Sequence, residues 1–356
     1  MKSYPAIVLE HLETLTDRTG IIQHSIFSIP NRRTGYTTDD NSRALIVALH
    51  EYERTHDRRL LRLVSTYLSF LHYAQMPNKR FHNFMSFDQI FLDNEGSEDC
   101  FGRVLWACGE AVAAGIHENV RKVARSLFDQ AVHWVPMLDS LRGKSYAAIG
   151  CAKYLKGYPE AEDVKLHLVQ LADKICATFK AYASKEWVWF EPFLTYSNGI
   201  PPRALFLAYQ CTGKEEYLDV GLKSLDFLNE ITTIDDIHQP IGCNGWYFRG
   251  SERAFFDQQP VDPMTSVTAN LSAYEVTKDS HYFKYARLAF DWFFGKNCVG
   301  EALYDPVTGG CYDALTPEGV NLNQGAESTV SCLLAQLAMA PYVESEVENA
   351  ITPRLL

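Results

Sequence analysis

Acidic side chains stand directly before three stretches of the chain that are almost entirely apolar. A helix that is apolar on every side is buried on every side, so these stretches predict buried helices. The segments are Thr38-Asp39-Asp40-Asn41 before 44–49, Ser97-Glu98-Asp99-Cys100 before 104–114, and Gln324-Gly325-Ala326-Glu327 before 330–340. The first turn of a helix offers unpaired N–H groups and the positive end of the helix dipole, which stabilise a carboxylate. We therefore expect three acidic clusters at the starts of three buried helices.

Such clusters favour acid–base catalysis. Crowded carboxylates raise one another's pKa, so a cluster can keep one acid protonated without a cofactor. Cleavage of a glycosidic bond needs this arrangement, with one carboxylic acid and a second carboxylate that acts as base or nucleophile. We predict Asp99 as the general acid and Glu327 as the base, with Asp40 as the alternative base. The competing interpretation is that Asp39 and Asp99 only cap their helices.

Aromatic residues in the long loops favour a sugar as the ligand. Sugar rings present apolar C–H faces that stack on aromatic rings, and hydroxyl groups that need charged or amide partners. We expect Trp189, Tyr196 and Trp246 to form platforms for a sugar, although loop aromatics also serve local packing. The other predicted substrate-binding residues are Tyr36, Asp39, Asn41, Arg43, Glu98, Arg103, Glu191, Asn198, Gln259, Asp262 and Gln324.

Two kinds of helical segment alternate along the chain. Six are amphipathic, with apolar residues at helical spacing on one side, and predict outer helices: 6–15, 58–75, 119–135, 163–182, 215–231 and 281–294. Six are apolar nearly all round and predict inner helices: 44–49, 104–114, 146–155, 203–211, 265–276 and 330–340. Strict alternation predicts six helical hairpins in an all-α, ring-shaped domain that spans 1–356.

The predicted links between helices are unequal. Links from inner to outer helices are short turns led by threonine, whereas links from outer to inner helices are long and hold most of the Gly, Pro, Trp and acidic residues. One face of the ring should therefore be plain, and the other should carry the acids.

This organisation resembles the six-hairpin (α/α)6 toroid superfamily, which contains many glycoside hydrolases, unsaturated-glycan hydrolases and the N-acylglucosamine 2-epimerase family. The resemblance implies a glycoside hydrolase that acts on a small oligosaccharide, and because toroid relatives often invert the anomeric configuration, it implies an inverting reaction. The segments 36–44 and 324–329 also look like parts of uncharacterised bacterial proteins associated with sugar-transferring enzymes. That likeness implies a functional link to a glycosyltransferase.

Two other functions remain open from the sequence. A sugar epimerase of the N-acylglucosamine 2-epimerase type would need proton-shuttling histidines in the cavity. We expect no histidine at an inner-helix start, and we expect only His82 and His238 in long loops. A non-catalytic glycan-binding partner of a glycosyltransferase would keep the aromatic residues but need no acid opposite a base.

Charge and cysteine usage narrow the remaining classes. A net charge of −11 without a Lys/Arg-rich run argues against nucleic acid or an anionic membrane surface as partner. Nine cysteines without a C-x-x-C pair are typical of a reducing compartment, so we expect a cytoplasmic protein. Metal-binding motifs such as H-E-x-x-H are absent from the sequence, and we expect no cofactor and no metal, with Ca²⁺ held by the acidic clusters as the alternative.

Overall fold

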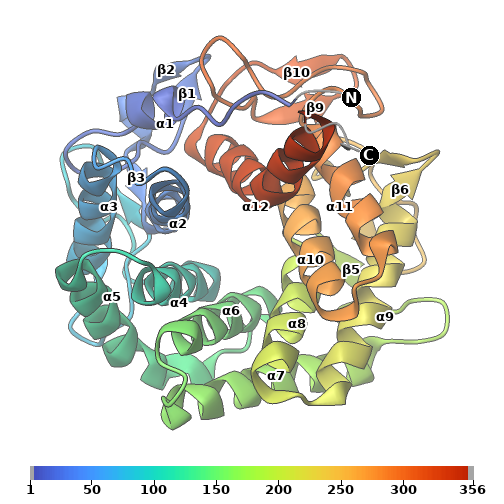
Figure 1. Cartoon of the computed structure of the whole chain (residues 1–356), viewed down its shortest axis with the longest axis horizontal. Helices are drawn as coiled ribbons and strands as arrows, with labels where there is room; N and C mark the ends of the chain where they lie inside the picture. The colour runs from blue at the N-terminus through green and yellow to red at the C-terminus, as the bar shows by residue number, and fades with distance from the viewer. Residues whose placement is uncertain (1–3, 352–356) are drawn as a thin grey trace.

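The computed structural model describes residues 4–351, and its helices form two concentric rings (Figure 1). The inner ring consists of α2 (Thr38–Thr55), α4 (Glu98–Ala113), α6 (Leu141–Gly157), α8 (Ile200–Thr212), α10 (Val261–Thr277) and α12 (Ala326–Ile351). The outer ring consists of α1 (Glu10–Leu15), α3 (Leu60–Ala74), α5 (Glu118–Ala131), α7 (Glu162–Tyr182), α9 (Glu215–Thr232) and α11 (Ser280–Trp292). Because α12 packs against α2 as well as α10, the ring closes. The all-α architecture that the alternation predicts is confirmed.

The inner helices are buried because their residues are small or apolar on every side. In α4, every residue from Cys100 to Val112 is buried. Glycines let α4 and α6 approach closely, since a Cβ atom on Gly109 would lie 2.3 Å from the carbonyl oxygen of Gly150. The outer helix α3, by contrast, buries only the stripe that contains Leu60, Val64 and Leu71.

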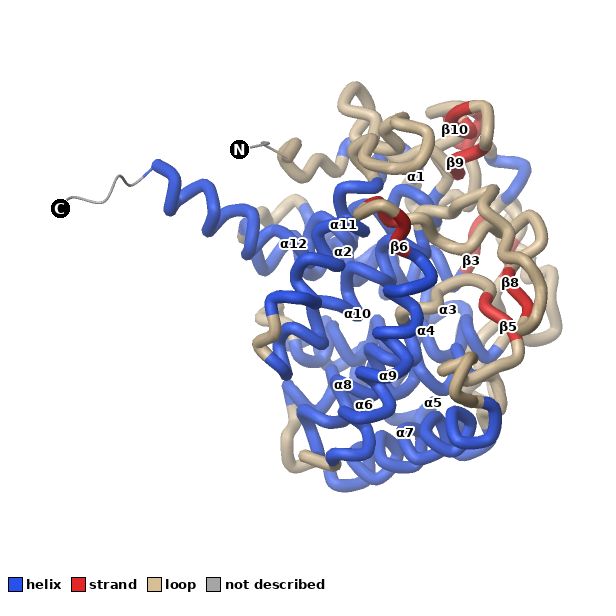
Figure 2. Tube along the Cα trace, turned by 90° about the vertical axis from the view of Figure 1, so that its right-hand side faces the viewer, coloured by secondary structure: helices blue, strands red, loops and turns tan. Residues whose placement is uncertain are grey.

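The two ends of the inner ring differ in their connections. At the end where the inner helices finish, links of two to four residues lead to the outer helices, and we call this the turn end. At the end where the inner helices begin, links of 9 to 33 residues arrive from the outer helices, and we call this the loop end. Figure 2 shows strands and long loops gathered on one side of the helical body. The predicted contrast between a plain and an elaborate face is present.

Short antiparallel strand pairs brace the long loops. The pairs are β1 (Ser25–Ile26) with β2 (Ile29–Pro30), β3 (Tyr36–Thr37) with β4 (Phe84–Met85), β5 (Phe193–Leu194) with β8 (Tyr247–Phe248), β6 (Thr233–Ile234) with β7 (Ile237–His238), and β9 (Ala314–Thr316) with β10 (Gly319–Asn321). Two 3₁₀ helices, Arg32–Thr34 and Val132–Met137, complete the regular structure. Within the described range, no helix is both long and apolar enough to cross a membrane.

The inner helices begin earlier than their apolar stretches predict. Helix α2 starts at Thr38 rather than at 44, and α4 starts at Glu98 rather than at 104. The first turn is polar, so hydrophobicity alone misplaces the boundary. The side chains that cap these helices belong to Thr37 and Ser97, which accept hydrogen bonds from backbone N–H groups two or three residues into the helix. Neither Asp39 nor Asp99 is the cap.

Candidate functional site

Two adjoining cavities open among the inner-helix N-termini at the loop end. The larger, which we call the sugar cavity, has a volume of about 320 Å³ and is lined by Asp39, Ser97, Asp99, Arg103, Tyr196, Trp246, Gln259, Val261 and Glu327. The smaller, which we call the side cavity, measures about 150 Å³ and is lined by Gln23, His24, Thr37, Asp39, Asp40, Arg43, Asn83, Phe84 and Glu327. Asp39 and Glu327 line both. The larger volume falls within the usual range of about 300–1,000 Å³ for small-molecule sites.

Asp99 is held in the sugar cavity by two hydroxyl groups. It lies in the first turn of α4, after the Ser97 cap. Its Oδ1 accepts a hydrogen bond from Ser140 Oγ at 3.0 Å, and its Oδ2 accepts one from Tyr196 OH at 2.7 Å. Hydroxyl groups can donate or accept, so these partners suit a carboxylate and a carboxylic acid equally.

Glu327 has a different kind of partner. Its Oε2 accepts a hydrogen bond from Arg43 Nη2 at 3.0 Å, and its side chain is 43% exposed. Arg43 also contacts Asp40 at 2.8 Å and Asp39 at 3.0 Å, although the arginine itself is only 1% exposed. One buried guanidinium therefore gathers three carboxylates from the first turns of α2 and α12.

Asp39 is shared between two arginines. Arg103 from α4 pairs with its Oδ2, and Arg103 also donates to Tyr146 OH at 3.1 Å. Burial opposes ionisation of Asp39, but the charges of Arg103 and Arg43 prevail and lower its pKa. Asp39 is therefore a permanent anion that holds two helices together at the cavity wall.

Asp40 and Asp262 are buried carboxyls with the opposite tendency. Burial raises the pKa of Asp40 to about 7, and Asp39 and Glu327 add to this while Arg43 opposes it. Burial likewise raises the pKa of Asp262 to about 7. Its Oδ1 faces the backbone and side-chain N–H groups of Asn198 at 3.4 Å, and its Oδ2 has no hydrogen-bond partner among the described residues. Each of these carboxyls can carry or lose a proton near neutral pH.

Tyr196 is fixed as part of the cavity wall by Arg142. The Arg142 Nε donates to the backbone oxygen of Tyr196 at 2.6 Å, and its guanidinium lies 4.6 Å from the ring centroid. Trp246 stands beside Tyr196, with ring centroids 6.3 Å apart. Two of the three predicted aromatic platforms therefore line the same cavity as Asp99.

Several predicted sugar-binding residues lie outside both cavities, and these assignments need correction. Trp189 is 0% exposed and packs on Phe190 and Phe227, so it belongs to the core. Tyr36 is also buried, since its ring packs against Phe70 of α3 and Phe87 while its hydroxyl donates to Asp17 at 2.7 Å. Both rings have partners inside the protein, and neither lines a cavity at the loop end.

Two polar residues that were predicted to bind sugar, Asn41 and Gln324, form hydrogen bonds inside the protein instead. Asn41 is 0% exposed, donates to Thr37 O and accepts from Ile21 N. Gln324 is buried among Asp305, Thr308 and the N-terminal segment. In both cases internal partners use the amide that was expected to meet a sugar hydroxyl.

Three further residues that were predicted to bind sugar, Glu98, Glu191 and Asn198, instead contact residues around the two cavities. Glu98 accepts from the backbone N–H groups of Asp139 and Ser140, which positions the Ser140 hydroxyl for Asp99. Glu191 pairs with Arg142 at 3.1 Å, and Asn198 bonds with Thr195 and Asp262. These side chains support the site without lining it.

A histidine that the sequence analysis overlooked lines the side cavity. His24 precedes β1 and shares the cavity with Asp40 and Glu327. The expected candidates do not reach either cavity: His82 bonds with the backbone of Asp93, and His238 is only 3% exposed. The available signal was position, since His24 falls in the long link before α2.

No cluster of metal-ligating type is present in the described part of the chain: nowhere do three or more His, Cys, Asp or Glu side chains lie where they could hold a metal ion. Arginine instead faces most of the carboxylates at the loop end.

Comparison with known proteins identifies the architecture. No family model matches the chain, and no curated protein sequence matches it. Solved structures match over almost the whole length. Cellobiose 2-epimerase from Bacillus thermoamylovorans superposes with a TM-score of 0.74 at 11% identity, covering 95% of this chain and 96% of that one. The fold is an (α/α)6 toroid.

Toroids with other activities match as well. A D-mannose isomerase gives a TM-score of 0.73 at 11% identity, covering 97% of this chain and 100% of that one. An inactive variant of an α-1,6-mannanase from Salegentibacter sp., solved with α-1,6-mannotetrose after two consecutive aspartates were replaced by alanine, gives 0.63 at 13% identity over 93% and 96% of the two chains. At these identities the matches establish the fold and leave the activity open.

Proposed function

We propose that this toroid is a sugar-processing enzyme that hydrolyses a glycosidic bond in a small oligosaccharide. The observation that carries the proposal is the sugar cavity itself, in which Asp99 and Glu327 share one space with Tyr196 and Trp246. These residues come from distant parts of the chain. A cavity with two carboxylates and two aromatic faces has the components of an acid–base glycosidase site.

The hydrogen-bond partners of Asp99 and Glu327 differ, and this difference assigns the general acid and the base. Asp99 contacts only hydroxyl donors, which tolerate a proton on the carboxyl, so Asp99 is the proposed general acid. Glu327 pairs with the guanidinium of Arg43 rather than with a hydroxyl donor, so Glu327 is the proposed base. Asp40 lines only the side cavity and is the weaker candidate for base.

The other lining residues supply recognition. Trp246 and Tyr196 offer ring faces for the C–H surface of a sugar, while Gln259 and Arg103 offer hydrogen bonds to its hydroxyl groups. The similarity to an α-1,6-mannanase supports a hydrolytic reaction. Inversion of the anomeric configuration is the outcome expected for a toroid of this kind.

Epimerisation or isomerisation of a sugar is the second candidate. His24 provides a base within the side cavity, beside Asp40, where a proton could be taken from a sugar carbon. The high structural similarity to an epimerase and an isomerase also supports this alternative. The two candidates use different residues, so they can be separated.

Incubation with cellobiose, α-1,6-mannobiose and free mannose, followed by ¹H NMR, tests both. Hydrolysis releases monosaccharides and reveals the anomer formed first, whereas epimerisation gives an isomer of unchanged mass. We expect hydrolysis of a disaccharide that Asp99→Asn abolishes and His24→Asn preserves. The reverse pattern would establish the second candidate. Sugar binding without turnover, insensitive to Asp99→Asn, would instead indicate a glycan-binding protein and contradict both.

A further inference from the structure

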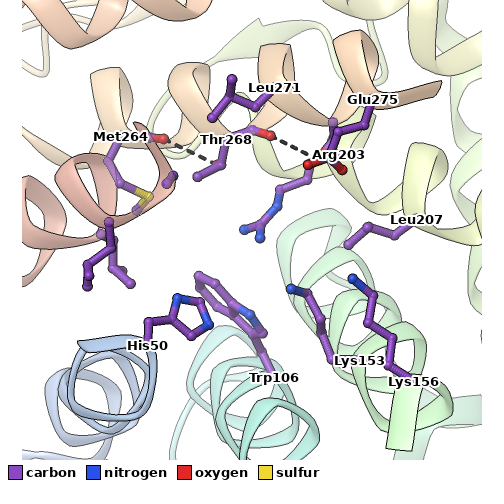
Figure 3. A pocket seen from close by; sticks show the side chains of 14 residues that line it. His50, Trp106, Lys153, Lys156, Arg203, Leu207, Met264, Thr268, Leu271 and Glu275 are labelled. Carbon is purple, nitrogen blue, oxygen red and sulfur yellow. Dashed lines mark hydrogen bonds between the residues drawn. The ribbon is translucent and has the colours of Figure 1, made fainter. Parts of the chain in front are cut away.

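A separate cavity occupies the axis of the ring toward the turn end (Figure 3). It has a volume of about 230 Å³, and every inner helix contributes to its wall. The polar lining residues are His50 from α2, Lys153 and Lys156 from α6, Arg203 from α8, and Thr268, Ser272 and Glu275 from α10. None of its lining residues belongs to the sugar cavity or the side cavity.

Arg203 is the central feature of this cavity. Its side chain is 7% exposed, and Figure 3 shows the guanidinium pointing into the open space. The Nε and Nη1 atoms have no hydrogen-bond partner among the described residues, and no carboxylate there lies within ion-pairing distance. Trp106 covers one face, with the guanidinium carbon 5.0 Å from the ring centroid. A ring face satisfies the charge in part, but it leaves the N–H edges free.

Burial of a guanidinium without an ion-pair partner costs free energy, and the charges of Glu110 and Glu275 offset this cost only in part. Burial lowers the pKa of Arg203, which shows how poorly the surroundings compensate the charge. The helix dipole does not help either, because Arg203 lies in the first turn of α8, where a cation is disfavoured. An arginine kept under these conditions calls for an anionic partner.

The neighbouring acid is already occupied. Glu110, buried beside the cavity, pairs with Lys153 at 2.9 Å and His50 at 3.3 Å, and accepts from Trp106 Nε1 at 3.0 Å. Among the described residues no carboxylate pairs with Lys156, and the nearby Lys153 charge, followed by burial, lowers the pKa of Lys156. The lining contains one acid, Glu275, against Lys153, Lys156 and Arg203, so the cavity has a surplus of positive charge.

We propose that this turn-end cavity binds a small organic oxyanion, either a carboxylate or a phosphate ester. The guanidinium of Arg203, whose Nε and Nη1 have no partner among the described residues, would donate N–H groups to the oxygens of the anion, because a planar guanidinium suits a carboxylate or phosphate. Lys156 would approach from the rim. Leu207, Leu271 and Leu334 supply an apolar wall for the carbon part of the ligand. The proposal is independent of the reaction at the loop end.

Isothermal titration calorimetry with inorganic phosphate and with pyruvate, at constant ionic strength, tests the inference on the full chain. We expect saturable binding of at least one anion, and the preferred anion identifies phosphate or carboxylate as the ligand chemistry. Arg203→Met should weaken that binding at least tenfold. The matched control is Arg59→Met, because Arg59 is exposed and pairs with Asp57, and this change should leave the affinity unchanged.

A second variant keeps the test decisive if Arg203→Met does not fold. Lys156→Met changes an exposed side chain at the rim and should weaken anion binding several-fold. Absence of saturable binding for both anions would overturn the proposal. So would binding that survives both substitutions, since the anion would then lie elsewhere, for instance against Arg103 in the sugar cavity.

Discussion

The loop end and the turn end of the inner ring differ in how charged side chains are placed on the helices, and the helix direction explains only part of the difference. Asp39, Asp99, Asp262 and Glu327 all lie in first turns, where the dipole favours an acid. Lys153 and Lys156 lie toward the end of α6, where it favours a base. These positions follow from helix orientation alone.

The informative residues are those placed against the dipole. Arg43 lies in the first two turns of α2, yet it is buried because three carboxylates surround it. Arg203 is also buried, in the first turn of α8, but no carboxylate of the described residues pairs with it. The comparison teaches that a buried charge is explained by its partners, and that a missing partner points to a ligand.

The largest expected effect is on turnover at the loop end. Asp99→Asn removes the proposed acid without changing its shape, so the turnover of a disaccharide substrate should fall by about 10²–10⁴-fold. Sugar affinity measured by calorimetry should be retained. The turn-end counterpart, Lys156→Met, should leave turnover unchanged, and an equal loss in both variants would break the proposed separation of the two ends.

The second effect concerns stability. Arg43→Met leaves Asp39, Asp40 and Glu327 without their shared cation, so the free energy of unfolding should fall by about 3–5 kcal/mol. Arg54 offers a control in the same helix at the turn end, where it pairs with Glu51 and Glu344 near the surface. Arg54→Met should cost about 1 kcal/mol or less in urea unfolding. Similar losses in the free energy of unfolding for both variants would mean that the buried cluster around Arg43 stabilises the protein no more than a surface ion pair does.

The third effect is a pH dependence of opposite sign at the two ends. Because the pKa of Asp262 is raised to about 7, its folded-state stability is full below about pH 4 and is lost as pH rises through 7. Relative to Asp262→Asn, the unmodified protein should lose up to about 4 kcal/mol between pH 4 and pH 8 in denaturant unfolding.

Asp57 at the turn end provides the contrast for that experiment. Its hydrogen bonds with Arg59 lower its pKa, so any stability it contributes is present near neutral pH and is lost on acidification. Asp57→Asn should therefore have a slight effect at pH 7 that disappears in acid. A pH profile for Asp262→Asn that parallels that of the unmodified protein would contradict the expected titration of Asp262.

The smallest effect concerns sugar stacking. Trp246→Ala removes one aromatic face from the sugar cavity, and a stacked ring contributes about 0.5–1.5 kcal/mol, so Kd should rise about 3- to 10-fold. Tyr158→Ala removes a ring that packs with Arg125 at the turn end and should leave sugar affinity unchanged. An unchanged Kd for Trp246→Ala would remove Trp246 from the binding site.

The ring could be predicted because hydrophobic periodicity can be read directly from the order of residues. Apolar stretches such as 104–114 indicate burial on all sides, and alternation with amphipathic stretches leaves few other arrangements. The sequence also placed Asp99 and Glu327 at the starts of inner helices, and Tyr196 and Trp246 in the long links, all at one end of the ring. Convergence follows from topology, so these positions could be predicted as a group.

Side-chain direction could not be predicted in the same way. Trp189 and Trp246 both stand in aromatic loop segments, yet one faces the core and the other faces the cavity. Local backbone conformation decides between these, and composition does not encode it. His24 was missed for a related reason, because a short strand pair folds its segment over the side cavity from outside the inner helices.

Closure of the ring makes the site a product of the whole chain. Arg43 belongs to the first inner helix and Glu327 to the last, and they meet only after the nine helices between α2 and α12 have been placed. Without α12, Arg43 would keep Asp39 and Asp40 but lose its third carboxylate, and both loop-end cavities would lack the wall that Glu327 provides. Closure of the ring and completion of the site therefore depend on the same helix.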